Sequence, residues 1–97
     1  MNVRFAPEAA DDLQEAMGWY SAREPSLGLE FLSAVARVIR RIGEFPESGH
    51  ESHDAIRRIP LRRFPYFVFY ALDADGAVVL GCLHAHRDPR IWPRRGP

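Results

Sequence analysis

Two stretches in the first half of the chain carry apolar residues at helical spacing. The first runs over about residues 7–22, after a short apolar strand at residues 3–5, and its acidic side chains lie on the other side of the predicted helix. The second repeats apolar residues at three- and four-residue steps over residues 27–42, and Ser26 is expected to cap it. Because only a short link separates them, the two stretches predict an antiparallel helical hairpin, whose apolar stripes need a common surface.

The second half of the chain has the pattern of β-strands. Three strands are predicted at about residues 56–61, 64–72 and 77–85. Residues 73–76 join the last two as a hairpin, with Gly76 free to take the positive φ that such a turn commonly requires. Residues 46–54 are polar, contain turn formers and show no period, so they predict a loop. Pro60 and Pro65 lack amide donors, which places the segment around them at a sheet edge or a bulge.

The order strand, helix, helix, strand, strand, strand predicts an α+β fold with two layers. In this fold the helical hairpin packs on one face of a small, mainly antiparallel sheet. All 97 residues form a single domain in this interpretation, with residues 88–97 as a C-terminal tail. Along the central strand, Phe67 and Phe69 point one way and Val68 points the other, so both faces of that strand are apolar. We expect the face opposite the helices to be left uncovered and to be closed by a partner.

Charge is distributed unevenly along the chain. The net charge is zero, but residues 1–54 hold five basic and ten acidic side chains (−5), and residues 55–97 hold eight basic and three acidic ones (+5). A neutral total argues against a protein that simply coats nucleic acid, whereas the basic half can present a local patch to an acidic partner. All thirteen basic residues are arginine, whose planar fork suits carboxylate or phosphate, although a GC-rich genome explains the same choice equally well.

Cysteine usage and apolar runs indicate the compartment. Cys82 is the only cysteine, so no intramolecular disulfide can form. The N-terminal residues carry no long apolar run, and we therefore expect neither a secretory signal nor a membrane span. The expected location is the cytoplasm.

The most distinctive segment starts at the end of the last strand and combines rings with positive charge. His84 and His86 are two positions apart, so they lie on one face of a strand, and arginines follow within reach of the same surface. Such a surface suits a phosphate, an acidic partner or a metal. A zinc site from His50, His53, His84 and His86 includes no carboxylate or thiolate at a recognised spacing, so no metal is expected. Both His84 and Trp92 also have a structural interpretation. His84 can close the strand through a hydrogen bond to the neighbouring backbone, and Trp92 can fold back onto the sheet as a plug.

Segments that carry a family resemblance extend over nearly the whole chain. They are Ala10–Leu13, Trp19–Tyr20, Gly28–Phe31, Ile59–Tyr66 and His84–Pro89. With this layout the chain resembles the RelE/ParE superfamily of toxins, the poison halves of bacterial toxin–antitoxin pairs. No single motif is diagnostic, and the match rests on the order of elements together with the Phe-Pro-Tyr strand and the final His, Arg, Asp-Pro and Trp cluster. The resemblance implies a cognate antitoxin that binds and silences this protein in a hetero-oligomer.

Two mechanisms occur within that superfamily. RelE-like members cut messenger RNA on the ribosome, whereas ParE-like members block DNA gyrase without a known catalytic step of their own. RNA cleavage needs a base, an acid and a cation on the phosphate, and His84, His86 and Arg58 could fill these roles. However, RelE-like nucleases usually display lysines and a strongly basic surface, and this chain has no lysine and is neutral overall.

The final Arg-Asp-Pro stretch and its following Trp look more like ParE-like members. We therefore expect a gyrase inhibitor without a cofactor, rather than a metal-independent endoribonuclease acting on ribosome-bound message. An inactive member that retains only antitoxin binding is the third alternative.

Two sets of contact residues follow from this interpretation. Target contacts are expected at Arg62, His84, His86, Arg87, Arg90, Trp92 and Arg94. Antitoxin contacts are expected at the aromatic residues Trp19, Tyr20, Phe67 and Phe69. Trp19 and Tyr20 are adjacent and cannot both face the core of one helix, so one of them should be accessible to a partner. Four arginines have an alternative interpretation as a solvated sheet edge whose charges discourage strand pairing: Arg57, Arg58, Arg62 and Arg63.

Overall fold

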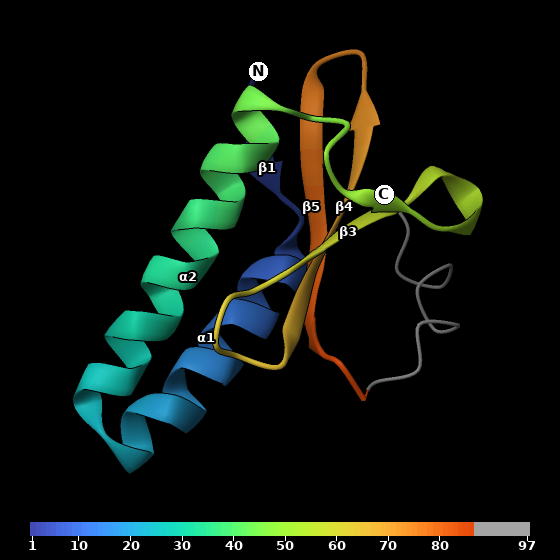
Figure 1. Cartoon of the computed structure of the whole chain (residues 1–97). Helices are drawn as coiled ribbons and strands as arrows, with labels where there is room; N and C mark the ends of the chain where they lie inside the picture. Colours follow the sequence, from blue (N-terminus) through green and yellow to red (C-terminus); the bar gives the residue numbers. More distant parts are fainter. Residues whose placement is uncertain (87–97) are drawn as a thin grey trace.

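The computed structural model describes residues 1–86 and has two layers, a helical hairpin on one side of a five-stranded sheet (Figure 1). In chain order the elements are β1 (Val3–Phe5), α1 (Pro7–Arg23), α2 (Pro25–Glu44), β2 (His50–Glu51), the 3₁₀ turn η1 (His53–Ala55), β3 (Arg57–Pro60), β4 (Tyr66–Asp73) and β5 (Gly76–His84). The strand order is β1-β5-β4-β3-β2, in which β1 is parallel to β5 and every other neighbouring pair is antiparallel. The predicted α+β fold is confirmed, with β2 and η1 added to the predicted elements.

Both helices of the hairpin begin with a proline. Pro7 starts α1 and Pro25 starts α2, where the missing amide costs no hydrogen bond and the fixed φ suits the helix. The expectation that Ser26 caps the second helix is wrong. The capping position is Glu24, and the Ser26 hydroxyl donates to the Glu24 carboxylate at 3.0 Å, because the proline already begins the helix one residue earlier. Within the described residues, neither helix is both long and apolar enough to cross a membrane.

The main core lies between the helices and the sheet. Phe31, Val35 and Ile42 of α2 meet Val68 and Tyr70 of β4, and each of these residues is at most 3% exposed. Burying an apolar side chain of this size contributes roughly 1.5–3 kcal/mol. This core fixes the hairpin on the sheet, and Val68 faces the helices, whereas Phe69 belongs to the cluster on the other face, as their predicted opposite directions require.

The second face of the sheet is also buried, which corrects the expectation that it is left uncovered. Phe69 is 6% exposed, Leu80 2% and Leu83 4%. Ile56 packs in the same cluster of buried residues. Residues 46–54, expected to be a plain loop, contain β2 and most of η1, and the segment that follows them carries Ile56 onto this face of the sheet.

The β4–β5 turn and the outer edge of β3 have the expected geometry. Gly76 has a φ of +134°, and a Cβ at this position would lie only 2.3 Å from the carbonyl oxygen of Asn2. The start of β1 therefore requires glycine there as much as the turn does. β3 pairs with β4 along its length but with β2 only at residues 57–58, so Pro60 lies where β3 is the edge of the sheet. Pro65 instead lies in the connection between β3 and β4.

Candidate functional site

A cleft lies where α1 passes the ends of β4 and β5. Its volume is about 490 Å³, which is enough for a small ligand or an inserted side chain. It is lined by Asp12, Glu15, Ala16, Trp19, Tyr20, Pro65, Tyr66, Leu83 and His84. The wall of the cleft therefore combines aromatic rings, two carboxylates and an imidazole.

A β-bulge determines how β5 enters the cleft. Between two successive residue pairs of the β4–β5 ladder, β5 contains one residue more than β4. Leu80 is this extra residue and has no paired residue on β4. Because successive residues of a strand point in alternate directions, the extra residue reverses the direction of the amides that follow. The Cys82 amide donates to Asp12 Oδ2 on α1 at 3.0 Å and so ties the helix to the strand end. Burial, with a smaller effect of Asp12, raises the pKa of the Cys82 thiol to about 12, which makes this cysteine unreactive at neutral pH.

Tyr20, which lines the cleft, packs in a cluster of aromatic rings. The centre of its ring lies 5.4 Å from that of Phe31, 4.9 Å from that of Phe64 and 6.2 Å from that of Tyr66. Aromatic pairs of this kind stabilise a core by about 0.5–1.5 kcal/mol each beyond their buried area. Burial raises the pKa of the Tyr20 hydroxyl, and the nearby Arg23 partly opposes this shift.

Trp19 stands at the rim of the cleft. Its side chain is 50% exposed, whereas Tyr20 packs against the main core, so the prediction that only one of the two faces the core is confirmed. The guanidinium carbon of Arg23 lies 3.2 Å from the centre of the Trp19 ring. The same guanidinium donates to the Trp19 carbonyl at 2.9 Å. The Trp19 ring therefore already accepts a cation on one of its faces.

His84 closes the opposite side of the cleft. Its ring meets Tyr66 edge-on at 5.3 Å between centres and stacks on His86 at 5.1 Å. The His86 amide donates to His84 Nδ1 at 3.2 Å, so the neutral His84 ring carries its proton on Nε2. This is the backbone bond expected of a residue that closes the strand. The half-buried ring nevertheless lines the cleft.

The cleft brings together residues from both predicted contact sets. Trp19 and Tyr20 were expected to contact an antitoxin and His84 a target, and all three line the same cavity. Sequence reasoning missed Asp12 and Glu15, because acidic residues on an amphipathic helix are usually solvated. The available signal was their spacing: Asp12, Glu15 and Trp19 follow one another at steps of three and four residues, which places all three on one face of the helix.

The structure does not bring Arg58 together with the two histidines. Arg58 pairs in register with Phe69, and its guanidinium lies over the Phe67 ring at 5.1 Å, on the sheet face opposite the helices. His84 pairs with Tyr66, which packs against the helix-facing core. Because paired residues share one face of a sheet, the side chains of Arg58 and His84 lie on opposite faces.

The other predicted contacts are dispersed. Arg62 is exposed and lines a separate groove along α2, Phe67 is half-buried, and Phe69 offers almost no surface to a partner. The predicted contacts that lie outside the described residues are Arg87, Arg90, Trp92 and Arg94. Within residues 1–86, no group of three or more His, Cys, Asp or Glu side chains is placed to hold a metal ion.

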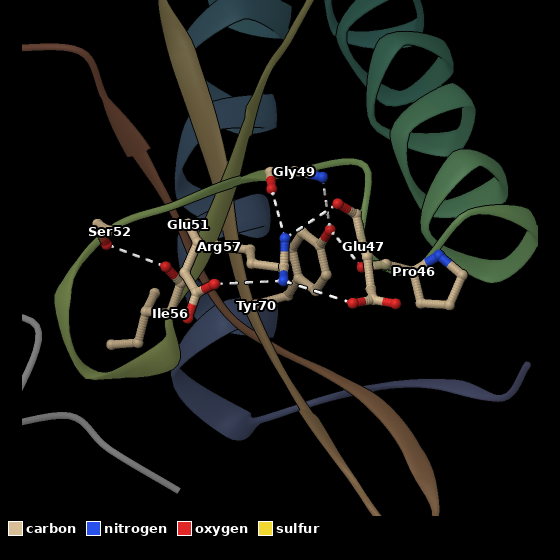
Figure 2. A network of polar contacts seen from close by, with 8 residues as sticks. All are labelled: Pro46, Glu47, Gly49, Glu51, Ser52, Ile56, Arg57 and Tyr70. Atoms are coloured by element: carbon tan, nitrogen blue, oxygen red, sulfur yellow. Dashed lines mark hydrogen bonds and ion pairs between the residues drawn. The ribbon is translucent and has the colours of Figure 1, made fainter.

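A network of polar contacts outside the cleft fixes the segment between α2 and β3, and Tyr70 is at its centre (Figure 2). The buried Tyr70 hydroxyl donates to the Pro46 carbonyl at 2.7 Å and accepts from the Gly49 amide at 2.9 Å. A Cβ on Gly49 would lie 2.6 Å from the Tyr70 hydroxyl oxygen, so the backbone passes directly over it.

Arg57 belongs to the same network and is not a solvated edge residue. Its side chain is 18% exposed, and its guanidinium donates to the carbonyls of Glu47 and Gly49, both at 2.9 Å. In Figure 2 the guanidinium lies between the carboxylates of Glu47 and Glu51, at 3.8 and 3.3 Å. Arg57 therefore has a structural role, because its charge and donors are used within the fold.

An apolar groove lies on the other flank of α1, where α1, α2 and β1 meet. It is lined by Phe5, Ala10, Leu13, Gln14, Met17, Phe31 and Leu32. Phe5 is 40% exposed and Leu32 47%. The sequence did not indicate this groove, because Leu32 belongs to the apolar stripe of a helix and Phe5 to an apolar strand, and both patterns predict burial.

The sequence matches a family model described as "ParE toxin of type II toxin-antitoxin system, parDE" over residues 3–89. These residues are most of the chain, so the chain belongs to the ParE toxin family of type II toxin–antitoxin systems. Membership of this family implies a cognate antitoxin as partner.

A solved structure described as "Chromosomal ParDE TA system from P. aeruginosa" has the same fold. The TM-score is 0.76 at 16% sequence identity, and the similarity covers 87% of this chain and 95% of that chain. At this identity the likeness shows the fold alone. No curated protein matches the sequence.

Proposed function

We propose that this chain stops bacterial growth by binding DNA gyrase and that a cognate antitoxin neutralises it in a cytoplasmic hetero-oligomer. The observation that carries this proposal is the match to the ParE toxin family over residues 3–89. Gyrase is the target that the ParE-like branch of the resemblance implies. On this proposal the protein is an inhibitor that acts by binding, and it needs no cofactor.

The placement of the candidate catalytic residues supports inhibition by binding over RNA cleavage. Cleavage needs an acid, a base and a cation arranged around one phosphate. The rings of His84 and His86 are stacked on each other, so both would approach a bound phosphate from the same side. Arg58 lies on the other face of the sheet. Ribosome-dependent mRNA cleavage is the alternative, and the histidine pair beside Tyr66 is the observation in its favour.

The exposed apolar surface of the hairpin supports antitoxin binding. The groove beside α1 leaves Phe5 and Leu32 partly exposed, and Trp19 projects at the rim of the cleft on the other flank. Apolar surface of this kind marks protein contacts, and tryptophan is a preferred anchor in them. We place the antitoxin across the outer face of α1, in contact with both flanks.

Induction of the chain in bacteria, with and without an antitoxin gene encoded beside its own, tests the proposal. Gyrase inhibition predicts growth arrest with supercoiling defects and a DNA damage response, while translation continues and the antitoxin restores growth. Immediate loss of ribosome-bound message, abolished by the joint substitution His84→Ala and His86→Ala, would contradict gyrase inhibition and favour the nuclease. Harmless expression of folded, soluble protein would indicate an inactive member that retains only antitoxin binding.

A further inference from the structure

We infer that the cleft between α1 and the ends of β4 and β5 receives an arginine or lysine side chain of the antitoxin. This inference rests on the proposed function, because it assigns a contact to the partner proposed there. The cleft differs from the apolar groove in its chemistry, and that difference specifies the kind of side chain that enters it.

The walls of the cleft suit a long side chain with a cationic end. Trp19, Tyr20 and Tyr66 present aromatic rings, against which the methylene groups of an arginine or lysine can pack. The ring of Trp19 already holds the guanidinium of Arg23 at 3.2 Å, so this ring binds cations in the folded protein. The cavity of about 490 Å³ has room for one such side chain with bound water.

Glu15 supplies the negative charge at the cleft. It is exposed on α1, and within residues 1–86 it makes no ion pair. Its carboxylate lies beside the aromatic rings that line the cleft, so a cation that enters the cleft meets both a negative charge and ring faces. The charge of the site therefore selects a basic side chain over an acidic one.

The position of the cleft favours the antitoxin as the source of that side chain. Met17 lines the apolar groove, Trp19 lines the cleft, and Gly18 between them has no side chain to separate the two. A segment that packs its apolar residues in the groove can therefore cross α1 and place a basic residue in the cleft. The same residue would cover His84, one of the predicted target contacts.

The test compares Glu15→Gln and Glu15→Arg with the control Glu8→Gln in the full-length chain. Glu8 is exposed on the same helix but lines neither the cleft nor the groove, so the control removes one exposed acidic charge from α1 outside both sites. The antitoxin encoded beside the gene is titrated by calorimetry at low and high salt. We expect Glu15→Gln to weaken binding about tenfold, Glu15→Arg to weaken it further, and the control to change it less than twofold. A basic-to-acidic substitution at one position of the antitoxin should restore binding to Glu15→Arg.

A second measurement observes the cleft without the antitoxin. Nα-acetyl-arginine methylamide should shift the indole NMR signal of Trp19 in the wild type and less in Glu15→Gln, whereas the uncharged citrulline analogue should not shift it. Stronger binding of this probe after removal of residues 87–97 would assign the cleft to the chain's own arginine-rich end and overturn the inference.

The two levels of the proposal can fail separately. An antitoxin that binds wild type and Glu15→Arg equally well overturns the inference and leaves the proposed function intact. Absence of any antitoxin binding to the wild type contradicts the proposed function itself.

Discussion

The substitution Tyr70→Phe tests how the segment between α2 and β3 is held. Tyr70 is fully buried, and its hydroxyl bonds the Pro46 carbonyl at 2.7 Å and the Gly49 amide at 2.9 Å. Removing this single oxygen leaves the ring and its packing in place but takes away the partner of both backbone groups. The stability change therefore reports the two hydrogen bonds and little else.

The expected loss follows from the burial of the two groups. The Gly49 amide is buried, and a buried donor without a partner costs about 1–3 kcal/mol. The Pro46 carbonyl is only partly buried and can bond water, so its lost bond adds about 0.5–1.5 kcal/mol. We expect a total loss of about 2–4 kcal/mol, a large part of the roughly 5–15 kcal/mol typical of whole proteins. A decrease of that size lowers the Tm of a domain of this length by at least about 8 °C.

Urea unfolding of wild type, Tyr70→Phe and the control Tyr20→Phe measures this effect. The Tyr20 hydroxyl makes no hydrogen bond with the described residues, so its removal should change the free energy of unfolding by less than about 0.5 kcal/mol. Equal losses in the two variants would refute the reasoning, because the segment would then be held by packing alone.

Other substitutions give further tests of the fold. Gly18→Ala should raise the free energy of unfolding by about 0.5–1 kcal/mol, because nothing lies within 4 Å of the added methyl. Gly28→Ala should lower the free energy of unfolding, because its methyl would collide with the facing helix α1. Cys82 should react with a thiol reagent only when the chain unfolds, and labelling of the native protein at pH 8 would contradict this. Burial raises the folded pKa of Cys82 to about 12. The stability that this thiol contributes should therefore be lost as pH rises from its unfolded pKa near 8.5 toward 12. The Arg4 guanidinium lowers the pKa of Asp73, so the stability this pair contributes is present above the unfolded pKa of about 3.9 and is lost as pH falls through the folded one. Asp73→Asn should therefore flatten the acid end of the stability curve, and an unchanged curve would show that the pair contributes nothing.

The helices and main strands could be predicted from the sequence, because each has a periodic apolar pattern of sufficient length. The strand β2 has only two residues, both polar, and it forms because β3 lies beside it, so no local pattern marks it. The Ser26 prediction failed for a different reason. Proline and serine both favour a helix start, and the proline comes first.

The cleft could be predicted only in part. The residues on α1 share one face by their spacing, but their meeting with His84 depends on the bulge at Leu80, which changes the direction of the β5 amides and lets Cys82 bond Asp12. A bulge is set by tertiary packing and has no reliable sequence signal here. Burial of the second sheet face was missed because Ile56 follows a polar segment that gives no indication of folding over that face.

The most direct test of the central claim is DNA supercoiling by purified gyrase in the presence of the purified chain, run beside ribosome-dependent cleavage of a defined message. We predict that the chain inhibits supercoiling, that the antitoxin relieves the inhibition, and that the message stays intact. Full supercoiling activity at an excess of chain, together with a cleaved message, would contradict the account.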